Sequence, residues 1–276
     1  MNAEAVVSHI VAWLDSYAEK SRVNGFVIGI SGGIDSAITS LLCAKTGRKT
    51  LLLEMPIYQA SSQVSRAREH IQRLRSEFPL VESREVELTN TFDTFVKAVA
   101  SANPDLSPEL ALANTRARLR MTTLYYFAGL EGLLVAGTGN KVEDFGIGFF
   151  TKYGDGGVDL SPIADLTKSE VYQLAAHLGV VDSIQRAAPT DGLWGDNRTD
   201  EDQIGASYPE LEWAMDFASH HITSDKQQAT DFSELAPRQQ EVLGIFLQRY
   251  RANRHKMIPI PVCEIPDSVR SLRAGQ

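Results

Sequence analysis

Short apolar runs alternate with longer amphipathic segments through the first half of this chain. The runs cover residues 26–30 (FVIGI), 51–55 (LLLEM) and 133–136 (LLVA), and polar residues do not alternate with apolar ones within them. Such runs are typical of strands that are buried on both faces of a parallel sheet. The amphipathic segments between them predict helices over residues 36–46, 61–76, 92–102 and 114–129. This rhythm predicts an α/β fold, a doubly wound, mostly parallel sheet flanked by helices.

The second half of the chain is less regular. Residues 146–166 and 187–209 are rich in glycine, proline and acidic residues, and we expect them to be irregular. Residues 167–170 (TKSE) match a capping box, which predicts a helix that extends to about residue 178. A last amphipathic helix is predicted over residues 237–252. Because no linker divides the chain, we expect a single domain over residues 1–276.

Composition narrows the class of protein. The net charge of −8 argues against general nucleic-acid binding but allows a local site for an anionic small molecule. The two cysteines are too few for a disulfide framework or a zinc site, which favours a reducing, cytoplasmic setting. Residues 1–20 include acids and predict an amphipathic helix rather than a signal peptide. No apolar stretch approaches the roughly 18 residues of a membrane span.

A glycine-rich turn, residues 30–36 (ISGGIDS), follows the first predicted strand. Its glycines let the backbone approach a ligand closely, and the amino end of the following helix attracts anions. The lysine of a P-loop and the GxGxxG pattern of dinucleotide-binding folds are both missing from this turn. Asp35 would repel phosphate unless a cation lay between them, which indicates Mg²⁺. A helix cap without a ligand is the alternative, and the complete string SGGIDS favours the phosphate site.

Two further segments carry candidate chemistry. Residues 137–143 (GTGNKVE) follow the third apolar run, at the end of a strand where the second half of a site would lie. Residues 149–159 (FFTKYGDGGVD) combine aromatic, basic, acidic and glycine residues without a helical pattern. Loops of this kind hold planar or charged ligands. A glycine-rich surface loop would not require the two phenylalanines, so we favour a binding function.

The string SGGIDS resembles the pyrophosphate loop of the ATP pyrophosphatase (adenine nucleotide α-hydrolase-like) superfamily. Residues 137–168 as a block resemble one branch of it, the ammonia-dependent NAD synthetases, as do residues 114–121 (NTRARLRM), 188–190 (APT) and 255–256 (HK). This resemblance implies a Rossmann-like ATP pyrophosphatase fold. It also implies a ligase that uses ATP and ammonia to convert deamido-NAD into NAD, AMP and pyrophosphate through an adenylated intermediate.

The resemblance further implies roles for individual residues. The expected ATP-binding residues are Gly29, Ile30, Ser31, Gly32, Gly33, Ile34, Asp35, Ser36, Thr138, Lys168 and Thr190. The expected deamido-NAD contacts are Arg118, Lys152, Asp159, His255 and Lys256. Asp35 and Glu143 are expected to bind Mg²⁺, and Asp35, Lys168 and Asp159 are expected to act in catalysis. No role is assigned to Asn140.

The resemblance implies a homodimer with the substrate site at the interface. The predicted helices around residues 6–17 and 114–129 have more apolar surface than one sheet face needs, which agrees with this. Glutamine-using relatives carry an additional amidase domain, for which residues 1–25 are too short, so free ammonia is the expected nitrogen donor.

Two alternatives remain open from the sequence. The first is another ATP pyrophosphatase, either tRNA-modifying or GMP-synthetase-like. The scarcity of cysteines and of basic surface disfavours a tRNA-modifying enzyme. The second alternative is a non-catalytic adenine-nucleotide-binding module, which the paired carboxylates of Asp35 and Glu143 disfavour.

Overall fold

A parallel sheet of four strands forms the centre of the molecule. The computed structural model describes residues 1–99, 107–190, 192–193, 198–222, 232 and 234–270. The strands are β1 (Gly25–Gly29), β2 (Lys49–Glu54), β3 (Val81–Glu85) and β4 (Leu133–Val135), in the spatial order β3-β2-β1-β4. In the centre of the sheet, Val27 of β1 lies in register with Leu51 of β2 and Val135 of β4. The parallel sheet of the predicted α/β fold is confirmed.

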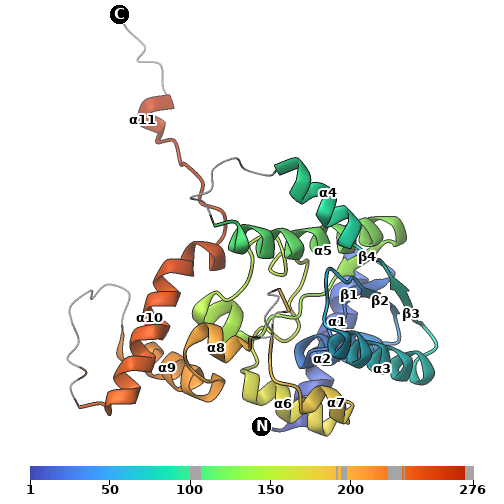
Figure 1. The fold of residues 1–276 in the computed structure, drawn as a ribbon, viewed down its shortest axis with the longest axis horizontal. Helices are drawn as coiled ribbons and strands as arrows, with labels where there is room; N and C mark the ends of the chain where they lie inside the picture. The colour runs from blue at the N-terminus through green and yellow to red at the C-terminus, as the bar shows by residue number, and fades with distance from the viewer. Residues whose placement is uncertain (100–106, 191, 194–197, 223–231, 233, 271–276) are drawn as a thin grey trace, which may run out of the picture.

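Helices cover both faces of this sheet (Figure 1). The helices on one face are α1 (Ala3–Ser21), α2 (Ile34–Lys45), α3 (Ser61–Glu77), α6 (Lys168–His177) and α7 (Asp182–Gln185), and those on the other are α4 (Thr89–Val99) and α5 (Glu109–Glu131). Successive side chains of β1 point to opposite faces of the sheet. Phe26 and Ile28 pack with the first group of helices, and Val27 packs with the second. This double burial explains why β1 appears in the sequence as an unbroken apolar run.

The edge strand β3 was not among the predicted strands. Its sequence is VESRE, and only Val81 in it is buried. The strand is held by its pairing with β2, from Thr50 opposite Val81 to Glu54 opposite Glu85. A polar edge strand of this kind has no hydrophobic pattern to detect, since backbone hydrogen bonds define it.

A third core lies beyond β4. The π-helix η1 (Val142–Ile147) packs there with α8 (Asp200–Ile204), α9 (Tyr208–His221) and α10 (Pro237–Met257). The expectation that residues 187–209 are irregular was wrong for the part that includes α8 and the start of α9. Both helices begin with a capping box, Thr199 with Asp202 and Ser207 with Glu210, within a segment otherwise rich in glycines and acids.

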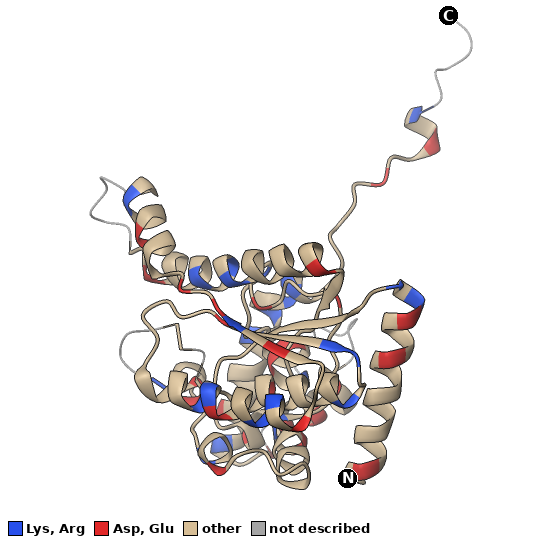
Figure 2. Cartoon of the chain, turned by 90° about the vertical axis from the view of Figure 1, so that its right-hand side faces the viewer, with Lys and Arg blue, Asp and Glu red and all other residues tan. Residues whose placement is uncertain are grey.

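Charges of both signs are distributed along the helices, and the C-terminal segment extends from the body of the molecule (Figures 1 and 2). Lys and Arg positions lie among Asp and Glu positions along the helices in Figure 2. The short helix α11 (Asp267–Arg270) projects away from the body of the molecule in both views (Figures 1 and 2). Among the described residues, no helix is both long and apolar enough to cross a membrane.

The sheet brings two of the candidate segments to one edge. The glycine-rich turn leaves the carboxyl end of β1, and residues 137–143 leave the carboxyl end of the neighbouring β4. Gly32 has a φ of +80°, and a Cβ on it would lie 2.4 Å from the backbone oxygen of Gln63 in α3. Only glycine fits this position, because both the backbone conformation and the close approach of α3 exclude a side chain.

Candidate active site

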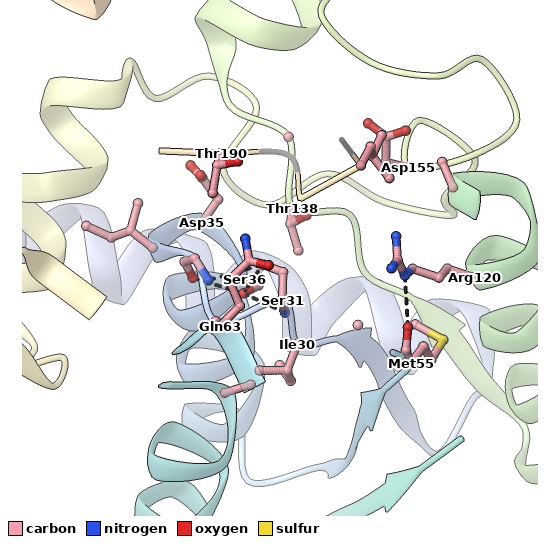
Figure 3. Close-up of a pocket in the computed structure, with 18 of the residues that line it drawn as sticks. Ile30, Ser31, Asp35, Ser36, Met55, Gln63, Arg120, Thr138, Asp155 and Thr190 are labelled. Carbon is pink, nitrogen blue, oxygen red and sulfur yellow. Dashed lines mark hydrogen bonds between the residues drawn. The ribbon is translucent and has the colours of Figure 1, made fainter. Parts of the chain in front are cut away.

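A pocket opens at the carboxyl ends of the strands (Figure 3). Every residue expected to bind ATP or Mg²⁺ lines it: residues 29–36, Thr138, Glu143, Lys168 and Thr190. Figure 3 shows the residues of the glycine-rich turn on one side of the pocket, with Arg120, Met55 and Asp155 on the other. The tertiary structure therefore brings these predicted residues together from segments far apart in the sequence.

The glycine-rich turn is held by its two serines. Ser31 Oγ accepts a hydrogen bond from Gly33 N at 3.1 Å, and Ser36 Oγ donates to Gly33 O at 2.9 Å. The two hydroxyl oxygens are 3.1 Å apart. Helix α2 begins immediately afterwards, and Gly33 at its N-cap provides no side-chain hydrogen bond to the first turn. The amino end of α2 thus faces the pocket with the positive end of its dipole, which suits a phosphate.

A buried charge cluster lies next to this turn. Lys168 Nζ is 2.6 Å from Asp35 Oδ2 and 3.0 Å from Glu143 Oε1, and Lys168 is only 3% exposed. Burial lowers the pKa of Lys168, but the carboxylates of Asp35 and Glu143 outweigh burial and raise it overall. Burial raises the pKa of Asp35, and the charge of Glu143 raises it further, against the opposing effect of Lys168. Two carboxylates share one ammonium, so negative charge exceeds positive charge in the cluster. A further cation would therefore be attracted to it.

This donor set fits a magnesium ion. Asp35 and Glu143 both bind the ammonium nitrogen of Lys168, so their carboxylates lie close together in the lining of the pocket. Mg²⁺ in proteins is commonly held by one or two carboxylates, with phosphate oxygens and water completing its coordination. Asp35 and Glu143 could therefore hold Mg²⁺ together with the phosphates of a nucleotide.

Asn140 has a place in this cluster that the sequence did not reveal. Its fully buried side chain donates from Nδ2 to Asp35 Oδ1 at 3.1 Å. Its Oδ1 accepts from the backbone N–H groups of Val142 and Glu143, at 3.2 Å each. Asn140 thus joins the Asp35 carboxylate to the start of η1, which carries Glu143. A possible signal was its spacing, since a polar residue three positions before a glutamate is common where a helix begins.

Three residues that line the pocket were also not predicted from the sequence. Burial raises the pKa of Asp144 to about 8, with a further contribution from the charge of Glu143. Burial raises the pKa of Asp155 to about 6, although its Oδ1 accepts from Thr151 N at 2.9 Å. Arg120 donates to Met55 O at 3.0 Å and faces the pocket, whereas the sequence favoured Arg118 of the same helix. Acidic and basic residues therefore border the same pocket.

Four of the expected deamido-NAD contacts form a second group, outside the lining of this pocket. Arg118 donates from Nε and Nη2 to Lys152 O at 3.3 Å, and Lys152 Nζ donates to His255 O at 2.9 Å. Lys256 Nζ donates to Phe150 O at 2.7 Å. Hydrogen bonds thus connect α5, the loop that follows η1 and the end of α10 at one place.

Asp159 lies apart from both groups. Its Oδ2 accepts from Val135 N at 2.8 Å and its Oδ1 from the hydroxyl of Tyr125 at 3.0 Å. These bonds tie the residue to β4 and α5, and the side chain is not part of the pocket lining. Its expected catalytic role stays a prediction.

Known proteins are similar to this chain over nearly its whole length. The NAD synthase family model matches residues 6–259. The NH(3)-dependent NAD(+) synthetase of Pyrobaculum aerophilum is 35% identical over 277 residues, covering 99% of this chain and 97% of that protein. Its counterpart in Carboxydothermus hydrogenoformans is 39% identical over 213 residues, covering 77% of this chain and 85% of that protein. Among solved structures, NMN synthetase from Francisella tularensis superposes with a TM-score of 0.80 at 30% identity, covering 96% of this chain and 100% of that one.

Proposed function

The chain belongs to the NAD synthase family, and on that premise we propose that it is an ammonia-dependent ligase that converts deamido-NAD into NAD. ATP is the co-substrate, and AMP and pyrophosphate are the other products. The observation that carries the proposal is the pocket in which the glycine-rich turn, Asp35, Glu143 and Lys168 meet. It combines a phosphate-binding turn with a cation site, as expected for an enzyme that cleaves ATP between its α- and β-phosphates.

The first step is attack by the nicotinate carboxylate on the α-phosphorus of ATP, which forms an acyl adenylate and releases pyrophosphate. The amino end of α2 and the ammonium of Lys168 bind the phosphates and oppose the negative charge that develops on the leaving group. When bound by Asp35 and Glu143, Mg²⁺ supplies additional positive charge at the phosphates. Because the nicotinate carboxylate is the nucleophile, the step requires no nucleophile from the protein. Catalysis then rests on positioning the substrates and neutralising charge.

In the second step, ammonia attacks the activated carbonyl carbon, AMP leaves with the bonding electrons, and the nitrogen loses a proton. We assign binding of deamido-NAD to Arg118, Lys152, His255 and Lys256, because hydrogen bonds gather these residues at one place. Asp159 is the residue we assign to ammonium binding and deprotonation. This assignment is tested by Asp159→Asn, which should raise the KM for ammonium more than the KM for ATP.

We further propose a homodimer with the substrate site at its interface and a cytoplasmic location, where NAD is synthesised. Helix α5 carries large apolar side chains at the surface, with Tyr126 63% and Leu130 61% exposed. An exposed apolar face of this kind is usually covered by a partner. Light scattering at micromolar concentration should give about twice the chain mass of 30.4 kDa. A monomer would contradict both the dimer and the placement of the substrate site at its interface.

The decisive experiment measures NAD formation from deamido-NAD, ATP and Mg²⁺, with ammonium or glutamine as the nitrogen donor. We expect product with ammonium and little product with glutamine in ammonia-free reagents. Release of pyrophosphate from ATP should depend on deamido-NAD, and release without it would contradict the proposal. Equal rates with the two donors would instead indicate an amidase activity.

A second candidate function is amidation of the corresponding mononucleotide to give NMN. We include this candidate because the similar structure from Francisella tularensis is named NMN synthetase. That structure covers 96% of this chain at 30% identity. The same assay with nicotinate mononucleotide in place of deamido-NAD distinguishes the two. We expect a higher kcat/KM for the dinucleotide, and the reverse order would establish the second function.

A further inference from the structure

Tyr208 contacts the candidate metal site from the third core. It is the first residue of α9, and its hydroxyl donates to Glu143 Oε1 at 2.6 Å. The same hydroxyl lies 3.2 Å from Asp200 Oδ2 of α8. Tyr208 and Asp200 are 3% and 5% exposed, so these contacts are buried. The Lys168 ammonium lies 4.7 Å from the centre of the Tyr208 ring, which adds a cation–π contact.

The surrounding structure holds Tyr208 firmly. Its backbone N–H donates to Glu201 Oε1 at 3.0 Å, and Ser207 before it begins α9 in a capping box with Glu210. Glu210 is itself paired with Arg238 of α10 at 2.7 Å. The Tyr208 ring packs in the third core. A hydroxyl on a ring held in this way has little freedom to follow Glu143, so it fixes where the carboxylate lies.

The side-chain hydrogen bonds of Glu143 involve one of its two carboxylate oxygens. Lys168 Nζ and the Tyr208 hydroxyl both bind Oε1. Over the part of the chain that the structure describes, the side-chain hydrogen bonds of Glu143 all involve this oxygen, and Oε2 has none. Two donors on one oxygen set the carboxylate plane and leave the second oxygen available for another ligand.

We propose that Tyr208 is a positioning residue for the metal site, whose hydroxyl holds Glu143 in the orientation that presents Oε2 to Mg²⁺. This inference rests on the proposed function, in which Asp35 and Glu143 bind the metal. Residues behind metal ligands orient them in this way, and their loss typically weakens metal binding by about 10- to 100-fold. Tyr208 itself does not line the pocket, so it would act only through Glu143.

The test compares Tyr208→Phe with Tyr250→Phe. The first variant keeps the ring and removes the hydroxyl that binds Glu143. The second removes a hydroxyl from the same third core, where the Tyr250 ring stacks on Phe246. Calorimetry then measures Mg²⁺ binding to each protein in complex with a non-hydrolysable ATP analogue. We expect the Kd for Mg²⁺ to rise by about tenfold or more in Tyr208→Phe and to stay within about twofold in Tyr250→Phe.

Steady-state kinetics provides the second readout. In Tyr208→Phe the Mg²⁺ concentration for half-maximal rate should rise by about tenfold or more, while kcat at saturating Mg²⁺ stays within about threefold of the unmodified protein. A purely structural role would not separate these two quantities. Mg²⁺ affinity unchanged in Tyr208→Phe would overturn the proposal, and so would loss of folding, because the hydroxyl would then serve the fold. Failure of the unmodified protein to bind Mg²⁺ would instead contradict the proposed metal site.

Discussion

Asn140 donates a hydrogen bond to Asp35 across 105 positions of sequence, with 3.1 Å between Nδ2 and Oδ1. The same side chain accepts from the backbone N–H of Glu143, so one amide sets both the Asp35 carboxylate and the start of the helix that carries Glu143. Since the Asn140 side chain is fully buried, its hydrogen bonds are shielded from water, and the relative position of the two acids depends on them.

We expect Asn140→Ala to lower both stability and metal affinity. The variant leaves two buried backbone N–H groups without their acceptor, each worth about 1–3 kcal/mol, and frees the Asp35 carboxylate. The Mg²⁺ requirement of pyrophosphate release should rise by about tenfold or more. Asn253→Ala is a matched control, because Asn253 donates to Ile147 O at the other end of η1. Asn253→Ala should lower the melting temperature without changing the Mg²⁺ requirement of pyrophosphate release. An equal rise of that requirement in both variants would refute the role of Asn140.

Asp35→Asn and Glu143→Gln should each abolish most activity while leaving the fold intact. Either amide can still contact Lys168, but it cannot neutralise a metal ion bound to phosphate. The rate of pyrophosphate release should fall by more than about 100-fold in each variant, with an unchanged circular dichroism spectrum. If both single variants retained Mg²⁺-dependent release of pyrophosphate, neither carboxylate could be a metal ligand.

Lys168→Met should reveal the repulsion between the two carboxylates. Removing one partner of a buried ion pair costs about 3–5 kcal/mol, since the remaining charges are left uncompensated. Mg²⁺ should then raise the melting temperature of the variant more than that of the unmodified protein. Lys141→Met, which removes an exposed ion pair with Asp165, should cost less than about 1 kcal/mol. Equal melting temperatures for the two variants would contradict this picture.

His70 should make stability depend on pH. Burial, with the nearby charge of Arg73, lowers the pKa of this imidazole to about 4, and its Nε2 lies 2.9 Å from Ser40 Oγ. Between about pH 4 and pH 6.5 the unfolded chain therefore binds more protons at His70 than the folded one. The free energy of unfolding should fall as pH falls through this range, by roughly 3 kcal/mol in total.

Urea denaturation at pH 7.5 and pH 4.5 measures this contribution. His70→Gln should lose about 2 kcal/mol less than the unmodified protein between these two values, because glutamine does not titrate. The other acidic and basic groups are common to both proteins and cancel in the comparison. Parallel losses in the two proteins would show that His70 contributes nothing to acid sensitivity.

The sequence by itself determined the strands β1, β2 and β4 and the residues of the glycine-rich turn. Strands buried on both faces leave unbroken apolar runs, such as Phe26 to Ile28, which are visible without a structure. The turn is largely local, because the hydrogen bonds of its two serines are formed within residues 30–36. Such features are visible in the sequence because consecutive residues carry their pattern.

Only the tertiary structure decided the remaining parts. Edge strand β3 depends on pairing with β2, and Asn140 and Tyr208 acquire their partners from segments 105 and 65 positions away. The same holds for Asp159, whose carboxylate accepts hydrogen bonds from Val135 N of β4 and from the hydroxyl of Tyr125 in α5. A polar side chain has no periodic pattern that indicates its partner, because a hydrogen bond depends on where the folded chain brings the two groups together.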